Sequence, residues 1–499
     1  MPSTGSEYIY TFDNSDDSEE DDAPSNNTLL STNATGSEFP PQKLEPDSPA
    51  PPSVALRALP TELLAIIFEF AVHDNPPSIY FTKNHPLYSI IRVCRRWRNV
   101  AVAIPKLWRE FVPYLCHNDR TVAPVYTVRK QLAILKAGDM HVRMGVWKDH
   151  DAVYFLLISL EQAHQWAFAQ LSLSHLGLAL ILSRGPFPRL HKLELSVSEW
   201  TYFIQIPPED EQRLQGYLAD PEYTSFPQLR ELTVYDDSTM LFKHPLFHMI
   251  TFSQLRICHL WECDADNALT VLSVLGPGSQ LSLFKCSGLE SDATLRPPFV
   301  VSISQLDFYN CCFAFSTAVL RKIGAAPLLT SFLIDASCDT LRDLELLPFF
   351  ERSGCALETL QLCPASYKLV DVMRLLRLPS VRTISVLVLA GFCIRSHLDN
   401  VACEFSRRTK SRASQSNQEK TVVVPSLQRL ELWYAPHLIS LNMLEALHRY
   451  RGSTLEQVIM ASPPVEGQDG KSEKRVNRLM ARGLQVTWNS ESDSLLEAS

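Results

Sequence analysis

Leucine and other apolar residues recur along the chain in one template, L-x-x-L-x-L, whose last two apolar positions alternate with other residues. The template or a close variant occurs ten times between residues 190 and 460. An alternating L-x-L segment predicts a short strand with one buried face, followed by a return as a helix or loop. The ten units are Leu190/Leu193/Leu195, Leu229/Leu232/Val234, Leu255/Cys258/Leu260, Gly278/Leu281/Leu283, Ile303/Leu306/Phe308, Leu329/Phe332/Ile334, Leu357/Leu360/Leu362, Val381/Ile384/Val386, Leu427/Leu430/Leu432 and Leu455/Val458/Met460.

The spacing of these units resembles that of leucine-rich repeats. Seven of the nine start-to-start spacings fall between 23 and 28 residues, within or near the period of that repeat family. Cys263, Cys286 and Cys311 occupy the position at which the family has Asn or Cys after the strand. Since one unit cannot bury its apolar face alone, stacked units share a core. We therefore expect an α/β fold, a solenoid with parallel strands on its concave face and helices or loops outside.

Three further segments extend the predicted stack. They are HVRMGVW at 141–147 as a first strand, Phe168/Leu171/Leu173 as an early unit and Ala481/Leu484/Val486 as a late one. The predicted boundaries are a disordered acidic tail at 1–52, a helical domain at 53–115, the repeat domain at 116–488 with a polar insertion at about 404–421, and a frayed end at 489–499.

Charge is concentrated in the tail. Residues 1–50 hold eleven acidic side chains and one basic one, whereas the whole chain has a net charge of −9. The remainder is near neutral, which argues against a nucleic-acid-binding protein. No apolar run is long enough to span a bilayer and no secretory signal is present, so we expect a cytoplasmic or nuclear protein that does not contact membranes. Ser15 and Ser18 are either kinase sites or part of a solvated tail, and RRTKSR (407–412) is either a nuclear-import signal or an insertion loop.

Composition gives no sign of catalysis. The sequence lacks the Gly-rich, Ser-elbow and His-Glu motifs that position phosphates, nucleophiles or zinc. The twelve cysteines include no C-x-x-C pair, and we expect reduced thiols. We therefore predict no enzyme activity, metal or cofactor.

Residues 59–72, LPTELLAIIFEFAV, predict a helix that begins at Pro60 and is apolar on nearly all sides. Such a helix has to bury two faces, one of them against a partner protein. Apolar residues then recur at helical spacing in HPLYSIIRVCRRWRNVAVA (85–103), and IPKLW (104–108) ends the unit.

Together, LP-x-ELL-x-x-IF, VC-x-x-W and P-x-LW resemble an F-box, particularly that of fungal, basidiomycete-type F-box proteins. The resemblance implies binding to Skp1 and, through it, to a cullin–RING ubiquitin ligase, with the repeat domain holding a protein substrate. It assigns eight residues to line or support the Skp1 surface: Leu59, Pro60, Leu63, Ile67, Phe68, Val93, Trp97 and Trp108. Two alternatives stay open, a scaffold that binds a partner without ubiquitin transfer, and a repeat-domain binder whose helices are an ordinary cap.

The position just after each L-x-L is predicted to face the concave surface. It holds aromatic residues in five of eight units, against 9% aromatic residues in the whole chain. Tyr and Trp are enriched where proteins bind one another most tightly. The predicted substrate-binding column comprises Tyr235, Trp261, Phe284, Tyr309 and Trp433, and the other three units place Asp335, Cys363 and Leu387 at this position.

Overall fold

A computed structural model describes most of the helical segment and the repeat region. The chain divides into two units, Met1–Leu59 and Pro60–Ser499, and every described residue except Leu59 belongs to the second. The predicted tail, the insertion at 404–421 and the last residues lie outside the described residues. The described residues are 59–72, 86–111, 132, 139–145, 150–173, 175–197, 212, 216, 224–235, 249–287, 297–336, 345–363, 374–390, 424–433, 454–460 and 471–488.

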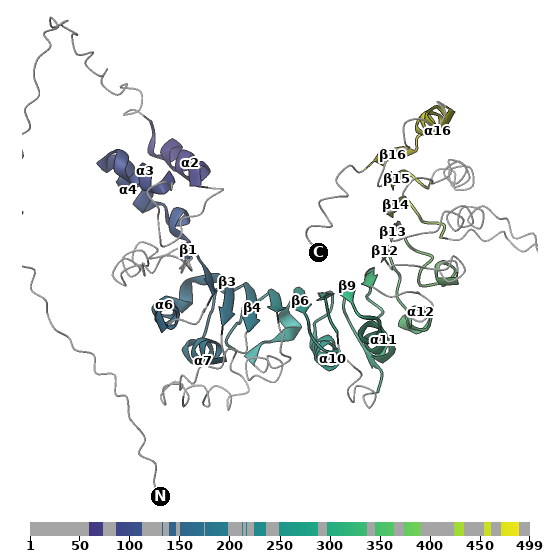
Figure 1. The fold of residues 1–499 in the computed structure, drawn as a ribbon, viewed down its shortest axis with the longest axis horizontal. Coiled ribbons are helices and arrows are strands. Elements are labelled where there is room, and N and C mark those ends of the chain that lie inside the picture. The colour runs from purple at the N-terminus through teal and green to yellow at the C-terminus, as the bar shows by residue number, and fades with distance from the viewer. Residues whose placement is uncertain are drawn as a thin grey trace, which may run out of the picture. The chain divides into compact units, whose positions relative to one another are not determined.

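Within the described residues, the repeat units form one parallel sheet of fourteen strands. These strands are adjacent in the order in which they occur in the chain (Figure 1). This order follows from the short, regular spacing of the L-x-L segments, because each unit returns the chain beside the strand it has just left. The strands are β1 (Glu110–Phe111), β2 (Met140–Gly145), β3 (Trp166–Leu173), β4 (Lys192–Val197), β5 (Glu231–Tyr235), β6 (Ile257–Trp261), β7 (Gln280–Phe284), β9 (Gln305–Cys311), β11 (Ser331–Ala336), β12 (Thr359–Leu362), β13 (Val386–Ala390), β14 (Arg429–Trp433), β15 (Gln457–Met460) and β16 (Gln485–Trp488).

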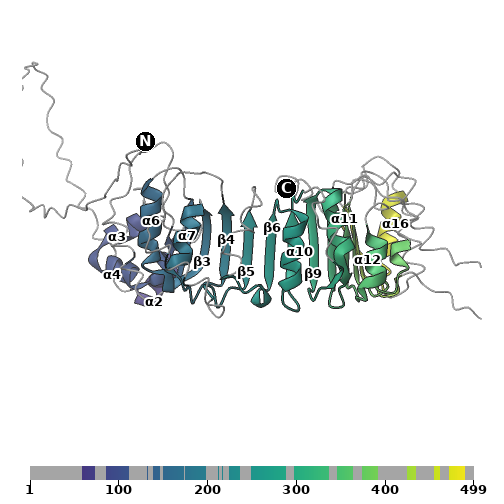
Figure 2. The same ribbon diagram turned by 90° about the horizontal axis from the view of Figure 1, so that it is seen from below.

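The described helices of the repeat region lie on one side of this sheet (Figure 2). We call the opposite side the open face; no described helix of the repeat region covers it in either view. None of the described helices is long and apolar enough to cross a bilayer. The helices are α6 (His150–Leu160), α7 (His175–Arg184), α10 (Ala265–Val274), α11 (Phe313–Lys322), α12 (Leu346–Ser353) and α16 (Lys471–Met480), with short 3-10 turns at Ala163–Gln165 and Phe252–Gln254 and a two-stranded pair of β8 (Phe299–Val300) with β10 (Ile323–Ala325).

The template leucines are aligned from strand to strand. Leu281 of β7 is in register with Leu306 of β9, which is in register with Phe332 of β11. All three side chains are fully buried. Since alternate residues of a strand face opposite sides, the residues between the leucines lie on the open face. For most units, the predicted strand register is therefore confirmed.

In three units the predicted register is wrong. Ala169 and Leu171 align with Leu193 and Leu195, so the unit Phe168/Leu171/Leu173 is displaced. Leu360 and Leu362 align with Leu387 and Leu389, so the true triplet of β13 is Ile384/Leu387/Leu389 rather than Val381/Ile384/Val386. Val458 aligns with Val486, which displaces Ala481/Leu484/Val486. In β13 successive positions are apolar on both faces, so alternation does not select the register. In β3 and β16 the displacement is two residues, which keeps the same residues facing inward, so alternation cannot detect it.

Aromatic side chains fill the core between the sheet and its helices. Phe332 of β11 lies 6.1 Å from Phe308 of β9, and 5.8 and 5.1 Å from Phe349 and Phe350 of α12, between ring centroids. All four rings are buried. Phe315 of α11 contacts Phe308 edge to face. This cluster ties two strands to two helices and explains why the units require their neighbours.

The helical segment leads directly into the sheet. Its elements are α2 (Thr61–Val72), α3 (Pro86–Val93), α4 (Arg95–Ala103) and the 3-10 turn η1 (Pro105–Trp108). β1 follows η1 at once and pairs with β2, so the sheet begins before the segment predicted as its first strand. The helical run predicted over 85–103 is interrupted at Cys94, whose backbone is extended, and Arg98 Nε donates to the carbonyl oxygen of Ile91 across the break.

Candidate protein-binding surfaces

Helix α2 has two apolar faces, of which one is buried. Leu64, Phe68 and Val72 recur every fourth residue and pack towards α3 and α4. The other large apolar side chains of α2 are exposed to solvent. Their exposed fractions are 47% for Leu63, 63% for Ile66, 46% for Ile67 and 82% for Phe70. We call these four residues the α2 apolar face.

Of the eight residues assigned to Skp1 binding, some are exposed in the structure and others are buried. Leu63, Ile67, Pro60 and Val93 are exposed, and Leu59 is partly exposed. Phe68 and Trp108 are buried, whereas Trp97 is half-buried. The four exposed residues are available to a partner, and the buried pair shapes the surface from below. Ile66 and Phe70 were not assigned, although a helical wheel of 59–72 places them beside Leu63.

The buried aromatic residues hold the three helices together. The ring centroids of Phe68 and Trp97 lie 5.1 Å apart. Trp108 Nε1 donates a 2.8 Å hydrogen bond to the carbonyl oxygen of Ala101, which satisfies its polar atom inside the core. These contacts fix α2 on α4 and η1, so the α2 apolar face is presented on a rigid support.

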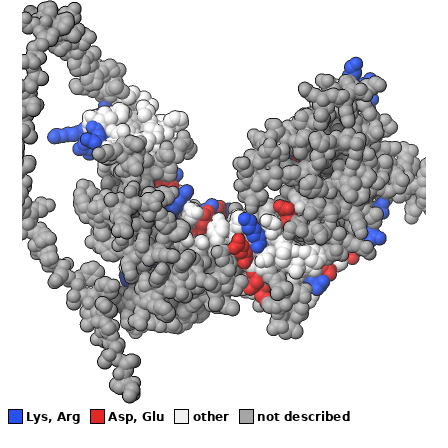
Figure 3. Space-filling view, in the orientation of Figure 1, with Lys and Arg blue, Asp and Glu red and all other residues white. Residues whose placement is uncertain are grey.

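Basic side chains gather beside this uncharged surface, on α3 and α4 (Figure 3). They include Arg92, Arg95, Arg96 and Arg98, as the sequence pattern indicates. Arg92 donates a 2.6 Å hydrogen bond to the hydroxyl of Tyr88 and lies 5.1 Å from its ring centroid. This side of the helical segment is therefore polar, in contrast to the α2 apolar face.

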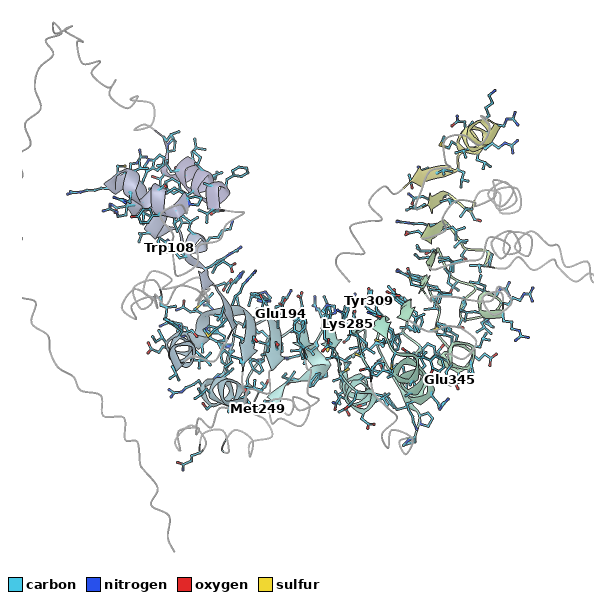
Figure 4. The ribbon with its side chains drawn as sticks, viewed as in Figure 1. Trp108, Glu194, Met249, Lys285, Tyr309 and Glu345 are labelled. Atoms are coloured by element: carbon cyan, nitrogen blue, oxygen red, sulfur yellow. The ribbon has the colours of Figure 1, made fainter. Side chains whose placement is uncertain are left out.

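The second candidate surface is a column of stacked rings on the open face. Tyr235, Trp261, Phe284 and Tyr309 occupy one register position on four neighbouring strands. Successive ring centroids lie 5.3, 4.4 and 4.6 Å apart, and the last two pairs are nearly parallel. All four side chains are partly exposed. Tyr309 is seen on the open side of the sheet with Glu194 and Lys285, away from Met249 and Glu345 (Figure 4).

The turn after each ring fixes the column. Glu262, Lys285 and Asn310 follow Trp261, Phe284 and Tyr309 and have a left-handed backbone, with φ of 57°, 51° and 51°. The amide of Lys285 donates to the carbonyl oxygen of Tyr309 over 2.8 Å, and that of Glu262 donates to Phe284 in the same way. This repeated turn aligns the strand ends from one unit to the next.

The cysteines of the repeat lie directly behind these turns. Cys263, Cys286 and Cys311 are buried, and Cys311 Sγ donates to the carbonyl oxygen of Leu283 over 3.2 Å. Cys286 Sγ lies 3.4 Å from Cys263 Sγ and 3.3 Å from the carbonyl oxygen of Phe284. A buried thiol that reaches backbone carbonyls satisfies groups that a larger apolar side chain would leave unpaired. The described residues hold no cluster of metal-ligating groups.

Two further residues predicted at this register position, Trp433 and Leu387, are not among the four stacked rings. Trp433 is the last residue of β14, in register with Ala390, and its side chain lies outside the described ones. Leu387, predicted at the same position, is fully buried and faces the helices, because the register of β13 differs from the prediction. Asp335 is in register with Tyr309 and continues the column on β11.

Asp307 lies on the open face beside the column, two residues before Tyr309 on β9. It is only 1% exposed. Oδ2 accepts hydrogen bonds from Gln305 Nε2 at 2.7 Å and Ser282 Oγ at 3.1 Å. No described group hydrogen-bonds to Oδ1. Burial raises the pKa of Asp307 to about 6, against the lowering effect of Gln305 and Ser282.

We expect Asp307→Asn to stabilise the fold at neutral pH. Because the pKa is higher in the folded chain, stability is lost as pH rises from about 4 through 6 and remains lower above pH 6. Raising the pKa by about two lowers the stability at pH 7 by about 3 kcal/mol. We therefore expect Asp307→Asn to gain of the order of 2 kcal/mol at pH 7 and little at pH 4. Urea unfolding at both pH values measures this. Glu194→Gln, which removes a carboxylate paired with Lys192 at 3.1 Å, serves as the control and gives no such gain; equal stability of Asp307→Asn and wild type at pH 7 would contradict the account.

Comparison with known families concerns the helical segment that carries the α2 apolar face. Among the curated proteins compared with the chain, none matches it. Residues 56–113, which include α2, α3, α4, η1 and β1, match the family model described as F-box-like. F-box domains are adaptor modules rather than catalytic ones. The chain therefore contains an F-box-like domain, and the α2 apolar face belongs to it.

Proposed function

We propose that this protein is the substrate-recognition adaptor of a Skp1–cullin–F-box ubiquitin ligase. The α2 apolar face carries the proposal, because four large exposed apolar side chains on a rigidly held helix favour burial against a partner. The F-box-like match of the same residues supports Skp1 as that partner, because F-box domains generally bind Skp1. In this role Leu63, Ile67 and Val93 contact Skp1, whereas Phe68 and Trp108 support the surface.

We propose further that the parallel sheet is a leucine-rich-repeat solenoid whose open face binds the substrate. The aligned leucines, the chain-order pairing of the strands and the cysteines behind each turn support this assignment. The stacked column gives the open face the aromatic groups that dominate binding energy in protein interfaces. The chain then supplies no chemistry of its own, but raises the effective concentration of substrate lysines near the ligase.

Co-purification separates this function from the scaffold alternative. We expect the tagged full chain, coexpressed with Skp1, a cullin and its RING partner, to retain all three. Retention of Skp1 without the cullin would favour a scaffold. A chain that retains neither, and whose other partners are unchanged by Leu59→Ala with Pro60→Ala, would be a repeat-domain binder with a helical cap.

A further inference from the structure

The carboxylates of the open face differ in whether they have a cation beside them. Towards one end Lys192 Nζ lies 3.1 Å from Glu194 and 3.7 Å from Glu231, and towards the other Arg429 lies 2.6 Å from Glu431. The two acids in the middle, Asp307 of β9 and Asp335 of β11, form no ion pair with any described Lys or Arg. The face therefore carries uncompensated negative charge at its centre.

Among the described side chains, the aromatic column ends at Tyr309, next to Asp307 and Asp335. One ring face of Tyr309 stacks on Phe284 at 4.6 Å. Its other face is directed towards β11, where the register position is held by Asp335. Cys363, the residue that follows β12, comes next and donates its amide to the carbonyl oxygen of Ile334 over 2.8 Å. No described ring or cation stacks on that second face. Because Asp and Cys are shorter than the rings, the side-chain height falls abruptly beyond Tyr309.

The acidic groups at this step act on the hydroxyl of Tyr309. Burial, together with the charges of Asp307, Cys363 and Asp335, raises the pKa of Tyr309 to about 12. Burial also raises the pKa of Asp335. No described cation lowers the pKa of either group, so a positive charge placed beside them would be favoured. An aromatic face beside carboxylates is also a favourable site for a cation.

We propose that the open face binds its protein partner through a lysine or arginine side chain. This side chain lies against the free face of Tyr309 and pairs with Asp335, beside the buried negative charge of Asp307. This inference deepens the proposed function, and rests on it, by stating the chemistry of the substrate: a segment with an exposed basic residue. The stacked rings beyond Tyr309 then contact the apolar residues that flank this basic side chain.

A peptide selection tests the proposal. The biotinylated full chain is used to select from a phage-displayed library of random seven-residue peptides. The consensus peptide and its basic-to-norleucine analogue are then measured by fluorescence anisotropy. We expect Lys or Arg at one fixed position, and binding about 10-fold or more weaker for the analogue. We expect the same loss for the consensus peptide with Asp307→Asn/Asp335→Asn.

Glu194→Gln is the matched control, since it removes a carboxylate of the same face that already has Lys192 beside it. We expect the affinity to stay within about twofold, because Glu194 lies on β4, several strands away from Tyr309 of β9. Selection of no peptide, selection without a basic position, or equal binding by the double variant would overturn the proposal. So would a wild-type dimer in sedimentation that the double variant abolishes, because a second copy would then occupy the face.

Skp1 binding, measured on the same preparations, separates this inference from the proposed function. Asp307 and Asp335 lie on β9 and β11, outside the F-box-like residues 56–113, so the double variant retains Skp1 if the adaptor function holds. A basic preference without Skp1 binding would leave the inference standing as a property of the open face and remove the adaptor role. Skp1 binding without the basic preference would leave the adaptor role standing and remove the inference about the open face.

Discussion

Ile67→Lys is expected to weaken Skp1 binding by about 100-fold or more while the chain stays folded. Ile67 belongs to the α2 apolar face and is 46% exposed, so the fold tolerates a charged side chain there. In the proposed complex the same position is buried against an apolar partner surface, where an unpaired ammonium group is strongly disfavoured. Calorimetric titration with purified Skp1 measures the change.

Val274→Lys is a matched control for this substitution. Val274 is an apolar residue of similar exposure, 45%, but it ends α10 of the repeat region. It is expected to bind Skp1 like wild type. If Ile67→Lys also bound Skp1 with unchanged affinity, the α2 apolar face would not be the Skp1 surface, whatever the fate of the control.

Phe332→Ala is expected to destabilise the repeat region by about 3–5 kcal/mol, the range for removing a large buried ring. Phe332 is fully buried and contacts Phe308, Phe349 and Phe350, so the change leaves a cavity where two strands meet α12. Such a loss is comparable with the whole stability of many domains. Urea unfolding followed by circular dichroism measures it.

Leu328→Ala provides the comparison for Phe332→Ala, because Leu328 precedes the same strand but is 46% exposed. We expect a change below about 1 kcal/mol at this position. A similar, small effect of both substitutions would mean that the aromatic cluster does not hold the units together.

Periodicity in the sequence is sufficient to predict the sheet, because each unit contains the alternation of buried leucines and open-face residues in its own sequence. It is insufficient where both faces are apolar. In Val386–Ala390 the sequence VLVLA offers two equivalent registers, and only pairing with Leu360 and Leu362 selects one. The break at Cys94 escaped prediction for a related reason, since apolar spacing continues through it although the backbone is extended.

The candidate sites likewise include features that the sequence pattern predicts and features that depend on tertiary packing. The aromatic column was predictable from one register position and is present as four stacked rings. The environment of Asp307 was not, because its burial and its hydrogen bonds depend on Ser282 from β7 and Gln305 from its own strand. Likewise, the separation of Phe68 and Trp108 from the exposed Ile67 requires knowing how α2 packs on α4 and η1.

Hydrogen exchange of the full chain with and without Skp1 tests the central claim most directly. The account predicts a one-to-one complex in which backbone amides of Thr61–Val72 become more protected, while the strands of the open face exchange as in the free chain. Failure to form a complex, or protection confined to the repeat strands, would contradict the assignment of this protein as an F-box adaptor.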